Sequence, residues 1–110
     1  MQNGTINHFK IVVPSYNNEK WIQACLRSVR NQKYENFQCI VVDDGSTDKS
    51  CRIIESEIEK DSRFLFLKNK TQKLALKNIY EAIEASKPNN EDIIITLDGD
   101  DWLASNNVLQ

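Results

Sequence analysis

Residues 37–48 read F-Q-C-I-V-V-D-D-G-S-T-D, an apolar run that passes through an acidic turn into residues that favour the start of a helix. The run at 37–42 is short and rich in β-branched and aromatic side chains, which predicts a buried strand. Ser46, Thr47 or Asp48 can cap the helix that follows. A strand followed directly by a helix is part of a βαβ unit, and the rest of the chain continues this alternation.

Three further strands are predicted at residues 9–13, 64–67 and 93–97. Pro14 should end the first of them, because proline cannot donate a hydrogen bond to a sheet ladder. The strand at 93–97 reads I-I-I-T-L and is hydrophobic throughout, so we expect both of its faces to be covered.

Two more helices complete the alternation. Asn17 or Asn18 can cap the helix after the first strand, and Glu19 would then lie in its first turn, where the helix dipole favours a carboxylate. The apolar stripe of this helix is Ile22, Cys25, Leu26 and Val29. The helix before the last strand should stop ahead of Pro88.

Four strands separated by three helices indicate an α/β fold in one domain over residues 1–110. We expect a three-layer, Rossmann-like parallel sheet with right-handed βαβ crossovers. In such sheets the ligand binds beyond the carboxyl ends of the strands, where the strand order reverses. Polar clusters follow three of the strands, at residues 15–18, 43–46 and 98–101. These clusters should therefore meet at one edge of the sheet and form the binding site.

The composition argues against several classes of protein. Fourteen Lys and Arg against 16 Asp and Glu give the 110 residues a net charge of −2, whereas proteins that bind nucleic acid carry a basic excess. No apolar run approaches the roughly 18 residues of a membrane-spanning helix, and residues 1–10 lack a signal-type segment. We expect a cytoplasmic protein, at most peripheral to a membrane. Three cysteines without C-x-x-C spacing predict reduced packing residues, not disulfides or a zinc site.

Asp98, Asp100 and Asp101 place three carboxylates within four residues, directly after the strand at 93–97. Carboxylates crowded this closely repel one another, and a hard divalent cation such as Mg²⁺ or Mn²⁺ offsets the repulsion. The alternative is a solvated acidic turn, since aspartate and glycine are common in turns. The position of the cluster at the shared edge of the sheet favours a metal site.

Asp43 and Asp44 end the strand at 37–42. A carboxylate in this position can accept a hydrogen bond from a base N–H or from a ribose hydroxyl. In the alternative interpretation, one of the two simply makes the turn with Gly45, and Asp48 caps the helix.

Four other side chains are candidates for contact with a nucleotide. Tyr16 can stack on a base, or it can merely pack against the first helix. Lys70, Lys73 and Lys77 lie near the start of the third helix, where they can face phosphate, although lysines on a helix are usually solvated.

Four segments together resemble the family 2 glycosyltransferases of the A-type nucleotide-sugar fold: I-V-V-P-S-Y-N-N-E-K (11–20), L-R-S-V-R-N-Q (26–32), V-V-D-D-G-S-T-D-K-S (41–50) and I-T-L-D-G-D-D-W-L (95–103). They span nearly the whole chain in the order and spacing of that family. The resemblance implies a metal-dependent, inverting transfer of a sugar from a nucleoside diphosphate, with UDP favoured. The acceptor hydroxyl would belong to a saccharide, a lipid or a protein.

The resemblance also implies roles for individual residues. In that family the residues matching Pro14, Tyr16 and Asp44 contact the nucleotide, the carboxylate matching Asp100 binds the metal, and the one matching Asp98 lies near the ribose and sugar. The candidates for nucleotide binding are Pro14, Tyr16, Asn17, Glu19, Asp43, Asp44, Lys77 and Asp98. The candidate metal ligands are Asp98, Asp100 and Asp101.

Two departures from the family pattern bear on function. The family often has a glycine-rich stretch ending in Arg-Asn where residues 69–78 read N-K-T-Q-K-L-A-L-K-N, with Lys77 and Asn78 as the nearest equivalents. The family's catalytic base and acceptor pocket come later than Gln110, so we expect these residues to be the nucleotide-sugar-binding part, inactive alone. Without later strands, the open sheet should expose an apolar edge that favours self-association.

Other classes fit the residues less well. Phosphatases of the haloacid-dehalogenase type carry D-x-D after the first strand and continue into Thr or Val, whereas here Trp102 follows and three strand–helix units come first. Nucleotidyltransferases of related architecture begin with a glycine-rich loop, and P-S-Y-N-N at 14–18 has no glycine. A non-catalytic nucleotide-binding or interaction module remains the alternative to an enzyme.

Overall fold

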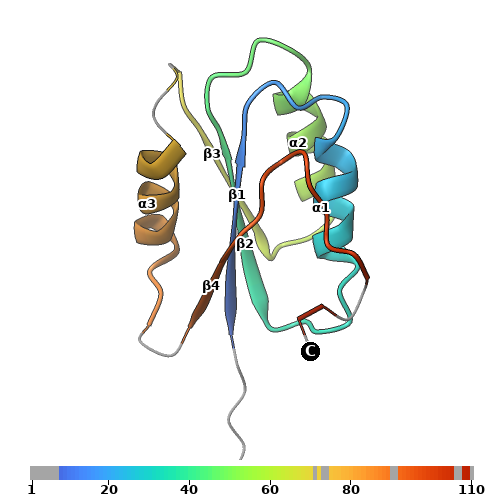
Figure 1. The fold of residues 1–110 in the computed structure, drawn as a ribbon, viewed down its shortest axis with the longest axis vertical. Helices are drawn as coiled ribbons and strands as arrows, with labels where there is room; N and C mark the ends of the chain where they lie inside the picture. Colours follow the sequence, from blue (N-terminus) through green and yellow to red (C-terminus); the bar gives the residue numbers. More distant parts are fainter. Residues whose placement is uncertain (1–7, 71, 73–74, 90–91, 106–107, 110) are drawn as a thin grey trace, which may run out of the picture.

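The computed structural model describes residues 8–70, 72, 75–89, 92–105 and 108–109. Its elements are β1 (Phe9–Ser15), α1 (Ile22–Arg30), β2 (Phe37–Asp43), α2 (Ser50–Ile58), β3 (Phe64–Lys68), α3 (Ala75–Ser86) and β4 (Ile93–Thr96). The strands run parallel in the order β3-β2-β1-β4 (Figure 1). The predicted alternation and the parallel sheet are confirmed.

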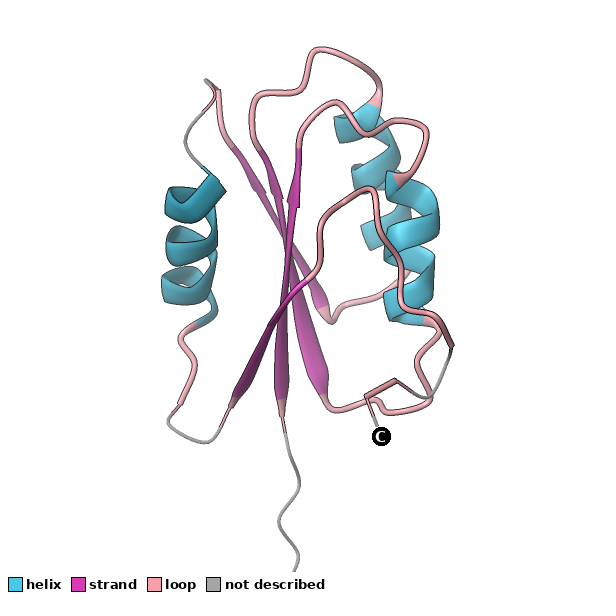
Figure 2. Cartoon of the chain, in the orientation of Figure 1, coloured by secondary structure: helices cyan, strands magenta, loops and turns pink. Residues whose placement is uncertain are grey.

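The helices form two layers, one on each face of the sheet (Figure 2). α1 and α2 cover one face, and α3 covers the other. Side chains alternate between the faces along each strand, so Ile11 and Val13 join the core under α1 and α2, whereas Val12 and Ile40 join a smaller core under α3. In the described part of the chain, no helix is long and apolar enough to cross a membrane.

The strand order reverses at β1. From β1 the chain moves outward to β2 and β3 through α1 and α2, and it then returns through α3 on the opposite face to pair β4 with the other side of β1. The loops that follow β1, β2 and β4 therefore meet at the carboxyl edge of the sheet, as expected for a ligand site in an open parallel sheet.

β1 is longer than predicted, because it continues through Pro14 to Ser15. Pro14 pairs in register with Val42, and its carbonyl accepts a hydrogen bond from Gly99 N at 3.0 Å on the side of β1 that faces β4. The nitrogen of a strand residue points to the same side as its carbonyl, and on that side β4 has already ended at Thr96. No ladder N–H is needed there, so the proline does not end the strand.

β4 contradicts the prediction of a strand covered on both faces. Ile93 and Ile94 are 39% and 38% exposed, and only Ile95 packs against the core. The physical reason is position: β4 is an edge strand of the sheet formed by the described residues, and α3 packs mainly over β1 and β2. An uninterrupted apolar run indicates a strand, but it does not say whether the strand lies inside or at the edge.

The predicted helix caps were wrong. α1 begins at Ile22 after Trp21, and no side chain caps it, so neither Asn17 nor Asn18 is a cap and Glu19 lies outside the first turn. α2 begins at Ser50, so Lys49 occupies its cap position, and no side chain of Lys49 caps it. Asp48 lies one residue earlier and accepts a hydrogen bond from Ser50 N at 2.9 Å.

The cysteines are free thiols, as predicted. Burial, with the nearby carboxylates at 98–101, raises the pKa of Cys25 to about 12. Burial also raises the pKa of Cys39. A thiol that stays protonated is a poor nucleophile, which agrees with a packing role.

Candidate functional site

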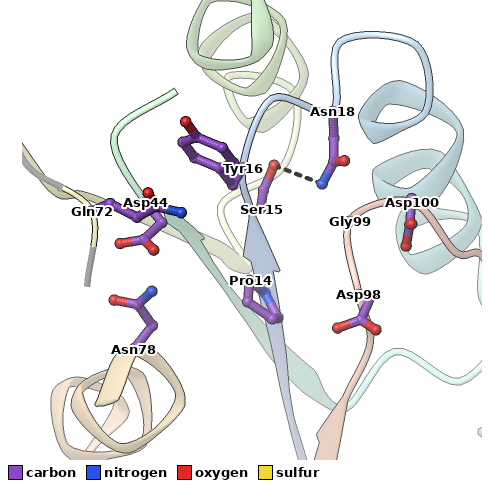
Figure 3. Close-up of a pocket in the computed structure, with 10 residues that line it drawn as sticks. All are labelled: Pro14, Ser15, Tyr16, Asn18, Asp44, Gln72, Asn78, Asp98, Gly99 and Asp100. Carbon is purple, nitrogen blue, oxygen red and sulfur yellow. Dashed lines mark hydrogen bonds between the residues drawn. The ribbon is translucent and has the colours of Figure 1, made fainter. Parts of the chain in front are cut away.

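A cavity of about 310 Å³ lies at the carboxyl ends of β1, β2 and β4, where the strand order reverses. It is lined by Pro14, Ser15, Tyr16, Asn18, Asp44, Gln72, Asn78, Asp98, Gly99 and Asp100. Figure 3 shows Asp44, Gln72 and Asn78 on one side and Asp98 with Asp100 on the other, with Pro14 and Tyr16 between them. The three polar clusters predicted to meet do contribute to one cavity.

The acidic side of the cavity is the loop that follows β4. Gly99 N donates to Pro14 O at 3.0 Å, which fastens this loop to the end of β1. A Cβ at Gly99 would lie 2.7 Å from Asn18 Nδ2 and 3.2 Å from both Ile22 Cδ1 and Pro14 O. The Asn18 amide would have to move aside and the Pro14 carbonyl to shift by a few tenths of an ångström, so the lack of a side chain at Gly99 favours this close approach.

The carboxylates of Asp98, Asp100 and Asp101 are exposed around the buried Gly99. One oxygen from each lies within 4.8 Å of the others. Among the described residues, these carboxylates take part in no ion pair and accept no hydrogen bond, so their charges are not offset within that part of the chain.

The opposite side of the cavity is built by Asp44, Asn69 and Asn78, from the ends of β2 and β3 and from α3. Asp44 is 6% exposed and Asn78 is 1% exposed, yet both line the cavity. Asn69 Nδ2 donates to Asp44 Oδ1 at 3.1 Å and to Asn78 Oδ1 at 2.7 Å. Asn69 is not among the residues predicted for the site, because no local pattern marks it and its two partners lie 25 and 9 residues away along the chain.

The two aspartates that end β2 have separate tasks. Asp43 is fully buried and accepts hydrogen bonds from Ser46 N at 2.9 Å and Ser46 Oγ at 2.5 Å, so it shapes the turn. It does not line the cavity, whereas Asp44 does. The turn interpretation is thus confirmed for Asp43, whereas contact of Asp44 with a ligand stays a prediction.

Asn17 and Glu19, predicted near the nucleotide, join the loop after β1 to the loop after β2. Asn17 has a φ of 51° and exchanges hydrogen bonds of 2.8 Å with Ser46 Oγ and Thr47 N. Glu19 N donates to Asp48 Oδ2 at 3.2 Å. Neither residue lines the cavity, so the structure gives them a role in holding the loops together.

The bonds that converge on Asp48 also affect its charge. Burial raises the pKa of Asp48, but hydrogen bonds from Ser50 and from Glu19 N outweigh burial and lower it. Asp48 thus stays ionised and connects the loop after β1 to the start of α2 through these hydrogen bonds.

Of the remaining candidates for nucleotide contact, only some line the cavity. Tyr16 lines it and is 42% exposed, as an aromatic ring available for stacking would be. Lys70 and Lys77 are exposed and do not line it. Lys73 lies outside the described residues. The described lining thus carries three carboxylates and no lysine or arginine.

A parallel α/β sheet with a carboxylate-lined cavity at its strand ends matches the A-type fold of glycosyltransferases. Residues 1–349 of TarS from S. aureus, solved with UDP, superpose with a TM-score of 0.80 at 28% identity, over 93% of this chain and 30% of that solved chain. The mannosyltransferase PcManGT from Pyrobaculum calidifontis, solved with GDP-Man and Mn²⁺, superposes with a TM-score of 0.79 at 18% identity, over 90% of this chain and 29% of that chain. The second likeness concerns the fold alone.

Sequence comparison identifies the family within this fold. The model of Glycosyl transferase family 2 matches residues 10–110, and the chain belongs to that family. EpsH from Bacillus subtilis, which carries a glycosyltransferase name, is 38% identical over 94 residues, or 84% of this chain and 26% of EpsH. The chain spans between 13% and 37% of the length of three curated relatives that it matches. The resemblance inferred from the four sequence segments is confirmed.

Proposed function

We propose that this chain binds the nucleoside diphosphate of a sugar donor, with a divalent cation, for a family 2 glycosyltransferase. The observation that carries the proposal is the composition of the cavity at the strand ends. A buried carboxylate and amide lie on one side, and a cluster of exposed carboxylates lies on the other, with an aromatic ring between them. A base and a diphosphate would use these two sides respectively.

The acidic cluster fits a hard divalent cation. Its ligand atoms are all carboxylate oxygens within 4.8 Å of one another, and oxygens on opposite sides of an octahedral Mg²⁺ are about 4 Å apart. The described lining has no cationic side chain that could neutralise a diphosphate. Asp98, Asp100 and Asp101 would hold Mn²⁺ or Mg²⁺, which when bound supplies Lewis-acid stabilisation of the leaving diphosphate.

UDP is the nucleotide that we favour. TarS, solved with UDP and with UDP-GlcNAc, is 27–28% identical to this chain over the shared fold. Within the cavity, we assign recognition of the base to Asp44, stacking to Tyr16 and contact with the ribose and sugar to Asp98. Pro14 shapes the floor between the two sides.

For the protein to which this chain belongs, we propose transfer of the sugar to an acceptor hydroxyl with inversion at the anomeric carbon. Donor binding is the contribution of this chain, and family membership supports the reaction type. The acceptor class, the catalytic base outside these residues and the cytoplasmic location remain predictions.

Replacing Asp44 with asparagine tests the assignment of the base side. The variant should bind UDP with Mn²⁺ about 10–100-fold more weakly, because a hydrogen bond to a charged acceptor is lost. Isothermal titration calorimetry measures the affinity, and Glu84→Gln, on the exposed surface of α3, is the charge-matched control. Equal affinities in the Asp44 variant and the wild type would remove Asp44 from the binding site.

Self-association through the edge of β4 is a further prediction. Ile93 and Ile94 are exposed on this strand, and unpaired apolar edges favour contact with a second chain. The sedimentation coefficient should rise with protein concentration, and Ile94→Lys should abolish the rise. The control is Tyr80→Lys on α3, where the replaced side chain is 63% exposed. A wild type that sediments as a monomer at all concentrations would contradict the prediction.

A further inference from the structure

Asn69 connects two cavity-lining residues from different elements. It lies just after β3, and its backbone N donates to Asp43 O at 2.9 Å, which fixes it beside the end of β2. Its side-chain Nδ2 carries two hydrogens, and both are engaged, one by Asp44 Oδ1 at 3.1 Å and one by Asn78 Oδ1 at 2.7 Å.

The chemistry of these groups fixes the orientation of both amides. An ionised carboxylate only accepts hydrogen bonds, so Asn69 must turn its NH₂ group, and not its oxygen, toward Asp44. The second hydrogen of that NH₂ then requires an acceptor, and Asn78 must present Oδ1 to it. The NH₂ group of Asn78 is consequently the group left for the cavity. Figure 3 shows the Asn78 side chain reaching from α3 toward Asp44.

We propose that Asn69 is a positioning residue that sets the polarity of the base site, holding Asp44 as an acceptor and the Asn78 NH₂ as a donor beside it. Such a pair is complementary to a base edge that carries a ring N–H next to a carbonyl, as uracil does. The inference rests on the proposed donor-binding function, and it adds two residues that determine which base is read.

Burial explains why the fixed orientation matters. Asp44 and Asn78 are 6% and 1% exposed, so water cannot readily replace a mismatched partner on either residue. A base that presents the wrong group to this pair would leave a buried donor or acceptor without a partner, which weakens binding substantially.

The test compares UDP with 3-methyluridine 5′-diphosphate, in which a methyl group replaces the ring N–H. Calorimetry with Mn²⁺ gives both affinities for wild type and for Asn69→Ala. The wild type should prefer UDP by about 10–100-fold, as expected for a hydrogen bond to a charged acceptor. In Asn69→Ala the preference should fall to about threefold or less, since the Asn69 NH₂ group no longer orients the Asp44 carboxylate and the Asn78 amide toward each other. Asn31→Ala, at the exposed C-cap of α1, should retain the wild-type preference.

Asn69→Ser is the second variant, because it keeps a polar side chain at this position if the alanine variant does not fold. Its hydroxyl carries a single hydrogen, so it can donate to at most one of Asp44 and Asn78 and leaves the other without a fixed orientation. The preference for UDP should therefore be lost here as well.

The outcomes separate this inference from the function on which it rests. Wild type that binds neither nucleotide overturns the donor-binding function and the inference with it. Wild type that binds both equally, or an Asn69 variant that loses affinity for both in the same proportion, overturns only the inference, because Asn69 would then have a purely structural role.

Discussion

Replacement of Asp100 by asparagine should weaken Mn²⁺ binding by at least about a hundredfold. Partners outside the coordination sphere already change metal affinity by about 10–100-fold, and Asp100 is assigned to the coordination sphere itself. The charge that it contributes is one of three that are not paired within the described residues. The fold should persist, since Asp100 is exposed and its side chain makes no hydrogen bond to them.

The chain carries a reporter for this measurement. It has two tryptophans, and one of them, Trp102, follows Asp101 directly and is 57% exposed. Mn²⁺ is paramagnetic and quenches a nearby indole, so titration with Mn²⁺ should reduce the fluorescence of wild type and of the surface control Glu84→Gln. Trp102→Phe should remove most of the quenching, which would show that Mn²⁺ binds near the acidic loop that precedes Trp102. If the fluorescence of Asp100→Asn were quenched at the same Mn²⁺ concentrations as that of wild type, Asp100 would not be a ligand of the metal.

Replacement of Glu57 by glutamine should lower the free energy of unfolding by about 2–3 kcal/mol at neutral pH. Glu57 lies on α2 with a side chain that is 3% exposed, and Arg30 of α1 binds it at 2.7 Å. Arg27 and Gln23 of α1 add hydrogen bonds of 3.3 and 3.1 Å. Breaking a buried pair leaves the partner charge without compensation, which is why a single substitution has a large effect.

The effect of Glu57 should depend on pH in a defined direction. Burial raises the pKa of Glu57, but hydrogen bonds from Arg30, Gln23 and Arg27 outweigh burial and lower it from 4.5 to about 2. A carboxylate with a lowered pKa in the folded state stabilises the fold fully above the unfolded value of 4.5 and loses this contribution as the pH falls toward 2. The fall from 4.5 to about 2 corresponds to about 3 kcal/mol, and the partly exposed Arg27 and Lys60 reduce it somewhat.

Urea unfolding of wild type and Glu57→Gln between pH 2 and pH 7 measures this contribution. The two curves of stability against pH should converge near pH 2 and differ most above pH 4.5. Glu55→Gln, on the exposed side of the same helix, should follow wild type throughout. A constant difference at every pH would mean that packing of the side chain, and not its charge, stabilises the contact between α1 and α2.

The fold and the location of the site were predictable because they depend on local patterns. Each strand is a short apolar run, the α1 stripe of Ile22, Cys25, Leu26 and Val29 has a helical period, and parallel strands bring their carboxyl ends to one edge. The sequence alone therefore sufficed to predict that Asp44, Asp98 and Asp100 lie at the same edge of the sheet, and all three line the cavity there.

Other features depend on contacts between distant residues, and the sequence does not contain them in a local form. Asn17 is a candidate for nucleotide contact because its loop follows β1, and Glu19 because of the family resemblance, but in the structure both bind the neighbouring loop. Asn69 acquires its importance only through Asp44 and Asn78, 25 and 9 residues away along the chain. Glu57 interrupts an apolar face, and only the packing of α1 against α2 shows why a carboxylate is buried there.

The central claim is that this chain binds a nucleotide together with a divalent cation, and a thermal-shift measurement with UDP and Mn²⁺ tests it most directly. At about a hundred times its dissociation constant, a ligand adds roughly 2.7 kcal/mol to the free energy of unfolding. For a domain of this size, UDP with Mn²⁺ should raise the melting temperature by about 10 °C or more, and a chelator should abolish the rise. Absence of a shift with UDP, GDP, dTDP and CMP, each with Mn²⁺, would contradict the claim.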